Sequence, residues 1–334
     1  MKRFVLHRIL QAIPLMIAIT LVIFIIIDAM PGNELISYIN SLPEGSPRPS
    51  PEQISQMQEV LQYNRPWHIR YFEWFTNALR GDFGTSLYYR RPASDIVGIL
   101  IWRTFMLNFT SMVFTFLLAI PIGVRSAAKR NSLFDNFFST TTLIAISLPA
   151  FFIGIYLMRL LAVNVSWIPP TGMRSIIYII KGYPNKLVEV LDVMRHMILP
   201  VLTLTLVGVG SVSRFIRNAV VDVINQDYIR TARSKGLKER TVIYKHALRN
   251  ALIPIISLVG VMIPTLFVGN IFVEAVFSWP GIGLEFLYAV FRRDTSMLSL
   301  LILIFALASV FGNFLADLLY GIADPKMNAE MEDE

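Results

Sequence analysis

The chain has 334 residues, of which 54% are hydrophobic and 16% are charged, and its mean hydropathy is +0.57. A water-soluble globular protein of this composition would leave too much apolar surface uncovered, so the composition excludes that class and favours the lipid bilayer as solvent. The chain contains no cysteine, which excludes disulfides, thiolate metal sites and thiol catalysis.

Six stretches contain no Asp, Glu, Lys or Arg over a length that can cross the hydrocarbon core of a membrane, for which a helix needs about 20 apolar residues. These runs are residues 9–27, 104–124, 136–158, 197–213, 250–273 and 295–316. The fourth run is the shortest, at the lower limit of about 17 residues, and still counts as a span. The sequence therefore predicts an all-α integral membrane protein with six transmembrane helices.

The first run follows a basic start, as the apolar part of a cleaved signal peptide would. It is longer than the roughly 7–15 apolar residues of a signal peptide, and "IIIDAMPGNE" offers no small-x-small cleavage site. We therefore expect residues 1–30 to form the N-terminus and a retained first span.

The basic residues cluster beside the ends of the runs and predict the topology. With the N-terminus inside, six spans place sixteen Lys and Arg residues on the cytoplasmic side, nine of them in residues 214–249. The opposite side receives thirteen, of which seven lie in the loop 31–103, and loops beyond about 60 residues are translocated regardless of charge. Without that loop, sixteen Lys and Arg residues on the cytoplasmic side compare with six on the external side, which puts both termini in the cytoplasm. The net charge of +7 therefore reflects topology and not a nucleic-acid partner.

Residues 31–103 are too long for a connector and too patterned for disorder, so we expect an external helical segment. In "SPEQISQMQEVLQYNRP", Ser50 is suited to cap a helix, Pro51 to its first position and Gln53 to a capping box. Next, "WHIRYFEWFTNALRG" has aromatic residues at helical spacing before Gly81. This second helix either lies in the outer headgroup region or packs its aromatic face onto a neighbouring helix, and the sequence leaves both open.

Residues 104–325 form the predicted five-span core, with a cytoplasmic loop at 214–250, and residues 326–334 form an acidic cytoplasmic tail. Few ionisable residues lie inside the predicted spans of this core. Arg159, Glu274 and Asp317 lie near predicted helix ends, where snorkelling or an interfacial partner stabilises a charge, and each is either structural or part of a pathway. Asn270 and Glu274, at the end of the fifth run, are the candidate pathway or gate residues.

The sequence lacks the residue patterns of common enzymes. It has no G-x-S-x-G or H-E-x-x-H motif, and its four histidines are scattered. It contains no Gly-Lys dipeptide and hence no Walker A phosphate loop, so this chain cannot hydrolyse ATP by that route. We expect no catalytic residue, no metal site and no cofactor in this chain.

The cytoplasmic loop contains the most informative stretch, "DYIRTARSKGLKERTVIYKHALRNALIPI". Asp227 is suited to cap a helix that runs through Lys235 and ends at Gly236, before a second helix leads into the fifth run. A helix of about two turns is marginal alone, so it must dock on something. We place Thr231 and Ala232 on its exposed face, flanked by basic residues, as a surface shaped to enter a groove on another protein. A solvated basic loop is the simpler alternative.

The order of these features resembles the "EAA" loop of ABC importer permeases in its peptide/nickel-type form, "DYIRTARSKGL…HALRNALIP". The resemblance covers essentially the whole chain, through "RIL…IPLMIAITLVIFII…MPG", "RPW…GDFGTSL", "AIPIGV…AAKRNSLFD", "HMILPVLTL", "FSWPGIG" and "DLLYGIADP". Arg230, Thr231 and Ala232 replace the Glu-Ala-Ala of the general loop, and Pro254 lies farther from Gly236 than in the commonest version. Both departures are usual in the peptide-type variant.

The resemblance implies a type I ABC importer permease fold in a prokaryotic plasma (inner) membrane. It implies a coupling helix that contacts a cytoplasmic ATPase through Asp227, Arg230, Thr231, Ala232, Lys235, Gly236 and Leu237. The implied partners are a homologous permease, two ATPase subunits that bind ATP and Mg, an external solute-binding protein and membrane lipid. Di- or oligopeptides are the implied solutes, although nickel chelates, glutathione and oligosaccharides use similar permeases. A free-standing secondary transporter and a membrane scaffold without transport are the alternatives.

Overall fold

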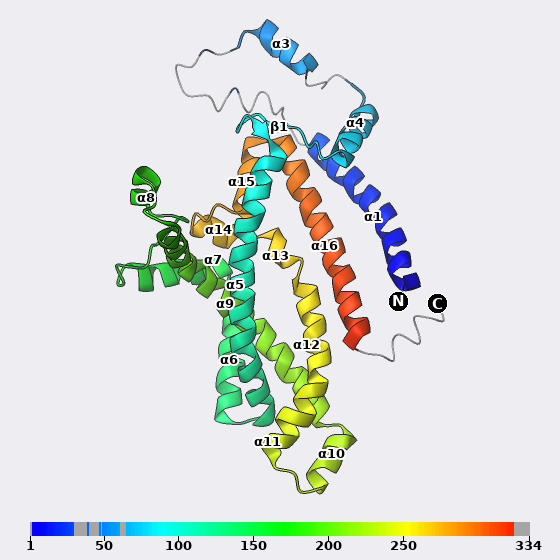
Figure 1. The fold of residues 1–334 in the computed structure, drawn as a ribbon, viewed down its shortest axis with the longest axis vertical. Helices are drawn as coiled ribbons and strands as arrows, with labels where there is room; N and C mark the ends of the chain where they lie inside the picture. Colours follow the sequence, from blue (N-terminus) through cyan, green and yellow to red (C-terminus); the bar gives the residue numbers. More distant parts are fainter. Residues whose placement is uncertain (1, 30–38, 40–46, 48, 61–64, 324–334) are drawn as a thin grey trace.

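The structure is a computed structural model that describes residues 2–29, 39, 47, 49–60 and 65–323. Within these residues the molecule is an elongated bundle of α-helices with one two-stranded sheet (Figure 1). The predicted acidic tail, 326–334, lies outside the described residues, as does most of the stretch between the first helix and Ser50.

In the described part of the chain, five helices are long and apolar enough to span a membrane, and a bent pair of helices adds a sixth if it counts as one span. The five are α1 (Lys2–Asp28), α5 (Ala93–Ala128), α9 (Lys186–Ile224), a composite helix Glu239–Val268 and α16 (Thr295–Ala323). The composite helix consists of α11 (Glu239–Thr241), the π-helical η2 (Val242–Ala247), α12 (Leu248–Met262) and α13 (Thr265–Val268).

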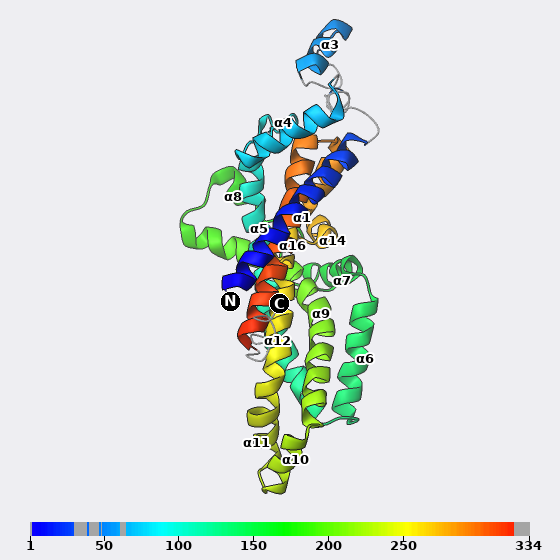
Figure 2. The ribbon, with the colours of Figure 1, turned by 90° about the vertical axis from the view of Figure 1, so that its right-hand side faces the viewer.

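The third predicted span is broken in the structure. α6 (Leu133–Ser147) meets α7 (Ala150–Leu157) and its π-helical continuation η1 (Met158–Ala162) at an angle of 102°, and Figure 2 shows α7 lying across the direction of α6. The break falls at Pro149, which has no backbone N–H and disfavours helical backbone at Leu148, where ψ is 135°. The prediction of one continuous helix over residues 136–158 is therefore wrong.

Other helix ends also differ from the charge-free runs. α5 begins at Ala93, inside the predicted external segment 31–103, because charged residues near a membrane surface do not end a helix. The fifth span ends at Val268 and not at residue 273, because Gly269 adopts a φ of +72° that a continuing helix does not allow. Two short helices follow it, α14 (Ile271–Val276) and α15 (Ile282–Arg292).

The capping box predicted before the first helix of residues 31–103 is confirmed. Helix α3 spans Pro51–Val60 at one end of the molecule (Figure 1). The backbone N–H of Ser50 donates to Gln53 Oε1 at 2.8 Å, and the backbone N–H of Gln53 donates to Ser50 Oγ at 3.2 Å. Two free donors at the helix start are thereby satisfied.

The aromatic helix α4 (Trp67–Leu79) packs on α1 near the same end of the molecule. Tyr71 is buried there, with its ring centroid 5.5 Å from that of Phe24, and its hydroxyl lies 3.1 Å from Thr20 Oγ1. The interpretation that the aromatic face packs onto a neighbouring helix is confirmed for this side of α4. Phe72, on another side, is 65% exposed.

A short β-hairpin fastens the start of α5 to the turn between α15 and α16. Strands β1 (Thr85–Ser86) and β2 (Arg91–Pro92) pair antiparallel. Ser86 Oγ hydrogen-bonds to Asp294, and the Tyr89 hydroxyl donates to Glu285 at 2.8 Å. Burial and the hydrogen bond to Glu285 raise the pKa of Tyr89 to about 12, so this hydroxyl keeps the proton that it donates.

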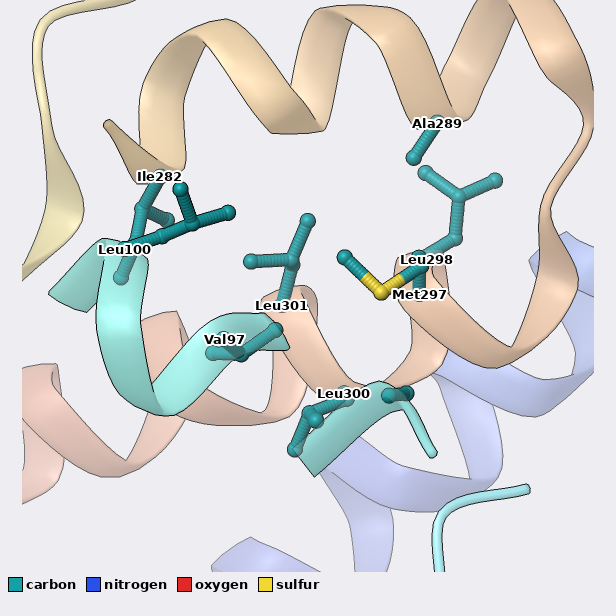
Figure 3. Packing of buried hydrophobic residues seen from close by; sticks show 9 residues of the cluster. Val97, Leu100, Ile282, Ala289, Met297, Leu298, Leu300 and Leu301 are labelled. Atoms are coloured by element: carbon teal, nitrogen blue, oxygen red, sulfur yellow. The ribbon is translucent and has the colours of Figure 1, made fainter. Parts of the chain in front are cut away.

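Two buried hydrophobic clusters make α5 the central helix. The first joins α5, α15 and α16, and Figure 3 shows side chains of all three helices meeting in it, among them Val97, Ile282 and Leu301. The second joins α5 to α9, η2 and α12 and includes Ala119 and Ile216. The α5 helix therefore contacts both halves of the chain.

Candidate functional site

The predicted coupling loop lies at the end of the molecule opposite to α3, α4 and the β-hairpin (Figure 1). Its first helix, α10, spans Asp227–Ser234, and a turn of residues 235–238 leads to α11. Gly236 in this turn has a φ of +76°, which confirms the left-handed conformation predicted for a glycine that ends a helix. A Cβ at Gly236 would have no atom of this chain within 4 Å, so the turn is open on its outer side.

One face of α10 is buried against the next segment of the same chain. Ile229 is fully buried and Ala232 is 8% exposed, and both belong to a cluster with Val242 and Ala247 of η2. Residues three positions apart share one side of a helix, so Ile229 and Ala232 face η2 together. The prediction that Ala232 lies on the exposed face is therefore wrong: its small side chain lets α10 pack closely on η2.

Polar contacts hold the loop together across the turn. Arg233 donates to both carboxylate oxygens of Glu239, at 2.7 and 3.2 Å, and Asn250 Nδ2 donates to the Tyr228 hydroxyl at 2.8 Å. The hydrogen bonds to Glu239 raise the pKa of Arg233, so its guanidinium is charged at any physiological pH. Together with the buried cluster, these contacts make α10, η2 and the start of α12 one packed unit.

The opposite face of the loop is exposed to solvent and mainly basic. It contains the other predicted coupling residues, namely Asp227, Arg230, Thr231, Lys235, Gly236 and Leu237. The predicted capping role of Asp227 is wrong, because Gln226 occupies the N-cap position of α10. The side chain of Gln226 makes no capping hydrogen bond. Asp227 lies instead in the first turn of α10, and its carboxylate is 3.4 Å from the Arg230 guanidinium. Its negative charge there stabilises the helix, because the N-terminal end of a helix carries a partial positive charge.

A cavity of about 270 Å³ lies among the long helices. It is lined by Asn108, Ser111, Met112, Thr115, Leu204, Gly208, Met262, Thr265, Val268, Gly269 and Asn270. These residues come from α5, α9, α12, α13 and the turn after α13. The lining combines apolar groups with uncharged polar groups and includes no Asp, Glu, Lys or Arg, so it can hydrogen-bond amide groups without holding a charge.

The two candidate pathway residues fall in different places. Asn270 lines the cavity, and its Oδ1 accepts the backbone N–H of Val273 at 3.1 Å, which caps α14. Glu274 is fully buried beside the cavity lining, where it accepts hydrogen bonds from Thr104 Oγ1 at 3.0 Å and from the backbone N–H of Leu284 at 2.8 Å. Of the two, only Asn270 therefore lines the cavity.

Two polar residues of α5 that the sequence did not single out belong to this region. Thr104 binds Glu274, 170 positions away, and Asn108 Nδ2 donates to the Thr265 carbonyl oxygen at 2.9 Å, 157 positions away. Both lie in the charge-free run 104–124, and no local sequence pattern predicts contacts between residues so far apart in the chain.

The remaining ionisable candidates lie outside the cavity lining. Arg159 is exposed in η1, and the side chain of Asp317 lies outside the described residues. Among the described residues, no three His, Asp or Glu side chains lie close enough together to hold a metal ion.

Comparison with known proteins identifies relatives along nearly the whole chain. The oligopeptide transport system permease protein AppB of Bacillus subtilis is 35% identical over 98% of this chain and 99% of that protein. The glutathione transport system permease protein GsiC of Salmonella typhimurium is 33% identical over 97% of this chain and 98% of that protein. The di/tripeptide transport system permease protein DppB of Pseudomonas aeruginosa is 32% identical over 98% of this chain and 99% of that protein.

One solved structure, of the MetNI methionine ABC transporter in an inward-facing conformation, is similar with a TM-score of 0.49 and 18% identity over 67% of this chain and 96% of that chain. At the level of families, residues 119–329 match the binding-protein-dependent transport system inner membrane components. This match covers more than half of the chain and includes the predicted coupling loop and most of the cavity lining. The chain therefore belongs to this family, the permease subunits of ABC importers.

Proposed function

We propose that this chain forms half of the membrane pathway of an ATP-driven importer for peptides that an external solute-binding protein delivers. Three relatives that align with nearly the whole chain are named for oligopeptides, glutathione, and di- and tripeptides. These solutes share peptide amides and free carboxylates. Di- or oligopeptides are therefore the solute class that the relatives support for this chain.

The cavity supports a pathway for such solutes. Its uncharged polar residues, such as Asn108, Ser111 and Asn270, offer hydrogen bonds to amide groups. A pathway must bind its solute weakly enough to release it, which favours this lining over fixed charges. A homologous second permease supplies the other half of the pathway.

The packing of α10 on η2 is the observation that best supports coupling of the pathway to separate ATPase subunits through this loop. Ile229 and Ala232 tie α10 to Val242 and Ala247 of η2, and η2 continues directly into α12. α12 ends at Met262, which lines the cavity. A partner that binds ATP and Mg²⁺ and moves the exposed face of α10 would therefore move the cavity wall.

The charge pattern supports the orientation of the chain in a prokaryotic plasma (inner) membrane. The nine basic residues of 214–249 lie at the α10 end, where the positive-inside rule places cytoplasmic loops. The α3 and α4 end then faces outward, toward the binding protein, and both termini are cytoplasmic.

Reconstitution of the four kinds of subunit in proteoliposomes tests the proposed function. We expect uptake of labelled peptides to require ATP on the α10 side and the binding protein on the other side. A control assembly whose ATPase subunits have lost their phosphate-loop lysine should not transport. Ion-driven uptake by this chain alone would instead favour a secondary transporter, and an assembly that never moves peptide would favour a scaffold.

A further inference from the structure

The segment from α13 to α15, whose start lines the cavity, folds around the buried side-chain carboxyl group of Glu274. Glu274 Oε1 accepts a hydrogen bond from the hydroxyl of Thr104, on α5, and Oε2 accepts one from the backbone N–H of Leu284, on α15. The oxygen of Thr104 in turn accepts the backbone N–H of Ile282 at 2.8 Å. A single side chain of α14 therefore joins α5 to the start of α15.

Three glycines approach this carboxylate so closely that no side chain fits between. A Cβ at Gly281 would lie 2.6 Å from Glu274 Oε2, and a Cβ at Gly283 would lie 3.0 Å from the same atom. A Cβ at Gly269 would lie 2.9 Å from Glu274 Oε1. Gly269 itself lines the cavity, so the carboxylate sets the position of the cavity wall without facing the cavity.

Further contacts fasten the same segment to α5. The indole Nε1 of the fully buried Trp279 donates to the Arg103 carbonyl oxygen at 3.3 Å, and Asn108 binds the carbonyl oxygen of Thr265 on α13. The junction to α12 differs, because Pro264, which has no backbone N–H, follows the end of α12 and interrupts the helix. Such an interruption is a place where a helix bends.

We propose that Glu274 is the positioning residue that locks α13 to α15 onto α5, so that this part of the pathway wall stays fixed while α12 moves with the coupling loop and bends at Pro264. The inference rests on the proposed function, since only an ATPase docked at α10 would move α12. Glu274 acts through Gly269 and does not touch the solute.

Substitutions of the lock test the inference in the reconstituted assembly. Glu274→Gln keeps the size of the side chain but replaces one acceptor oxygen with a donor, and Thr104→Val removes the hydroxyl at nearly constant shape. Each substitution leaves a buried hydrogen-bond partner unsatisfied, which weakens the contact by roughly tenfold, so we expect uptake per ATP hydrolysed to fall by about that factor. Membrane amount and copurification of the ATPase should stay unchanged.

Thr110→Val is the matched control, because the Thr110 hydroxyl donates only to the Met106 carbonyl oxygen of its own helix, at 2.7 Å. It should leave the ratio of uptake to hydrolysis at the parent value. If Glu274→Gln and Thr104→Val lower uptake and hydrolysis in equal proportion, the residues are merely structural and the inference is overturned. A parent assembly that imports no peptide would overturn the proposed function, and this inference with it.

Spin labels give a direct test, because this chain has no cysteine of its own and accepts cysteine pairs without competing thiols in the same subunit. Ile99 on α5, Val261 on α12 and Phe291 on α15 are 54%, 57% and 76% exposed. In the assembled parent, we expect ATP to change the distance between labels at Val261 and Phe291 but not the distance between labels at Ile99 and Phe291. In Glu274→Gln, ATP should also change the second distance. A second distance that already changes in the parent, or a first distance that never changes, would overturn the inference.

Discussion

At the scale of single residues, a substitution at Gly236 distinguishes strain within this chain from contact with a docked partner. Its φ of +76° disfavours any residue with a Cβ, by on the order of 1 kcal/mol. The surroundings within the chain add nothing, because no atom lies within 4 Å of an added Cβ. A larger effect of a side chain at this position would therefore arise from a surface that docks against the turn.

We predict that Gly236→Asp leaves membrane insertion and pairing with the second permease intact, while it abolishes uptake and weakens ATPase binding. The strain in the turn is too small to unfold the packed spans, whereas a charged side chain in a docking cleft adds steric and desolvation penalties. Copurification of the ATPase and peptide uptake measure the two effects. Lys238→Gln, an exposed change in the same turn, is the control and should do little. If Gly236→Asp membranes import as the parent does and retain the ATPase, the loop is only a solvated basic turn.

At the scale of elements, the contact between α10 and η2 is the step through which movement would reach α12. Ile229 is fully buried in that contact. Ile229→Ala would cost about 2–5 kcal/mol of packing energy and loosen α10 from η2. We predict that the variant keeps ATPase binding, because the outer face is unchanged, but loses most of the peptide uptake for each ATP hydrolysed.

Ile256→Ala on α12 is the matched control for that prediction. Ile256 is 38% exposed, so its truncation removes much less buried contact. Parent-like coupling in Ile229→Ala, or an equal loss of coupling in both variants, would contradict the proposed route through η2.

The sequence predicted elements where a local cause decides them. Residues 295–316 lie within α16, because an apolar run of that length has no alternative in a bilayer. The bend at Pro149 was missed for a physical reason. Pro14, Pro121, Pro200 and Pro254 all lie inside continuous helices, so a proline alone does not decide whether a membrane helix breaks.

The candidate site shows the same division between local and long-range causes. Gly236 was predictable, because backbone chirality makes glycine the residue for a left-handed turn. The inward side of α10 was not, because Ala232 faces η2 only through a packing contact that the helix itself does not specify. The bond between Thr104 and Glu274 joins residues 170 positions apart, and one sequence gives no sign of such a pair.

At the scale of the whole molecule, the loops predicted to be cytoplasmic and the segment predicted to be external lie toward opposite ends. The turn that contains Asn131, between α5 and α6, lies toward the α10 end, and α4 lies at the other (Figures 1 and 2). We predict that reporters fused after Asn131 and after Lys238 read cytoplasmic. Reporters near Gly182, which follows α8 (Ile176–Lys181), and near Ser46 should read external. A cytoplasmic reporter at Ser46 would reverse the proposed orientation.

Cross-linking in the intact assembly tests most directly whether the exposed face of α10 binds the ATPase. Because the chain has no cysteine, single variants carry the only reactive thiol of this subunit. Thr231→Cys lies on the exposed face, Ala232→Cys on the buried face, and Leu79→Cys at the far end on α4, where Leu79 is 74% exposed. We predict that a short bifunctional reagent joins Thr231→Cys to the ATPase in high yield, and joins neither Ala232→Cys nor Leu79→Cys. No product from Thr231→Cys, or an equal yield from Leu79→Cys, would contradict the assignment of this loop as the coupling site.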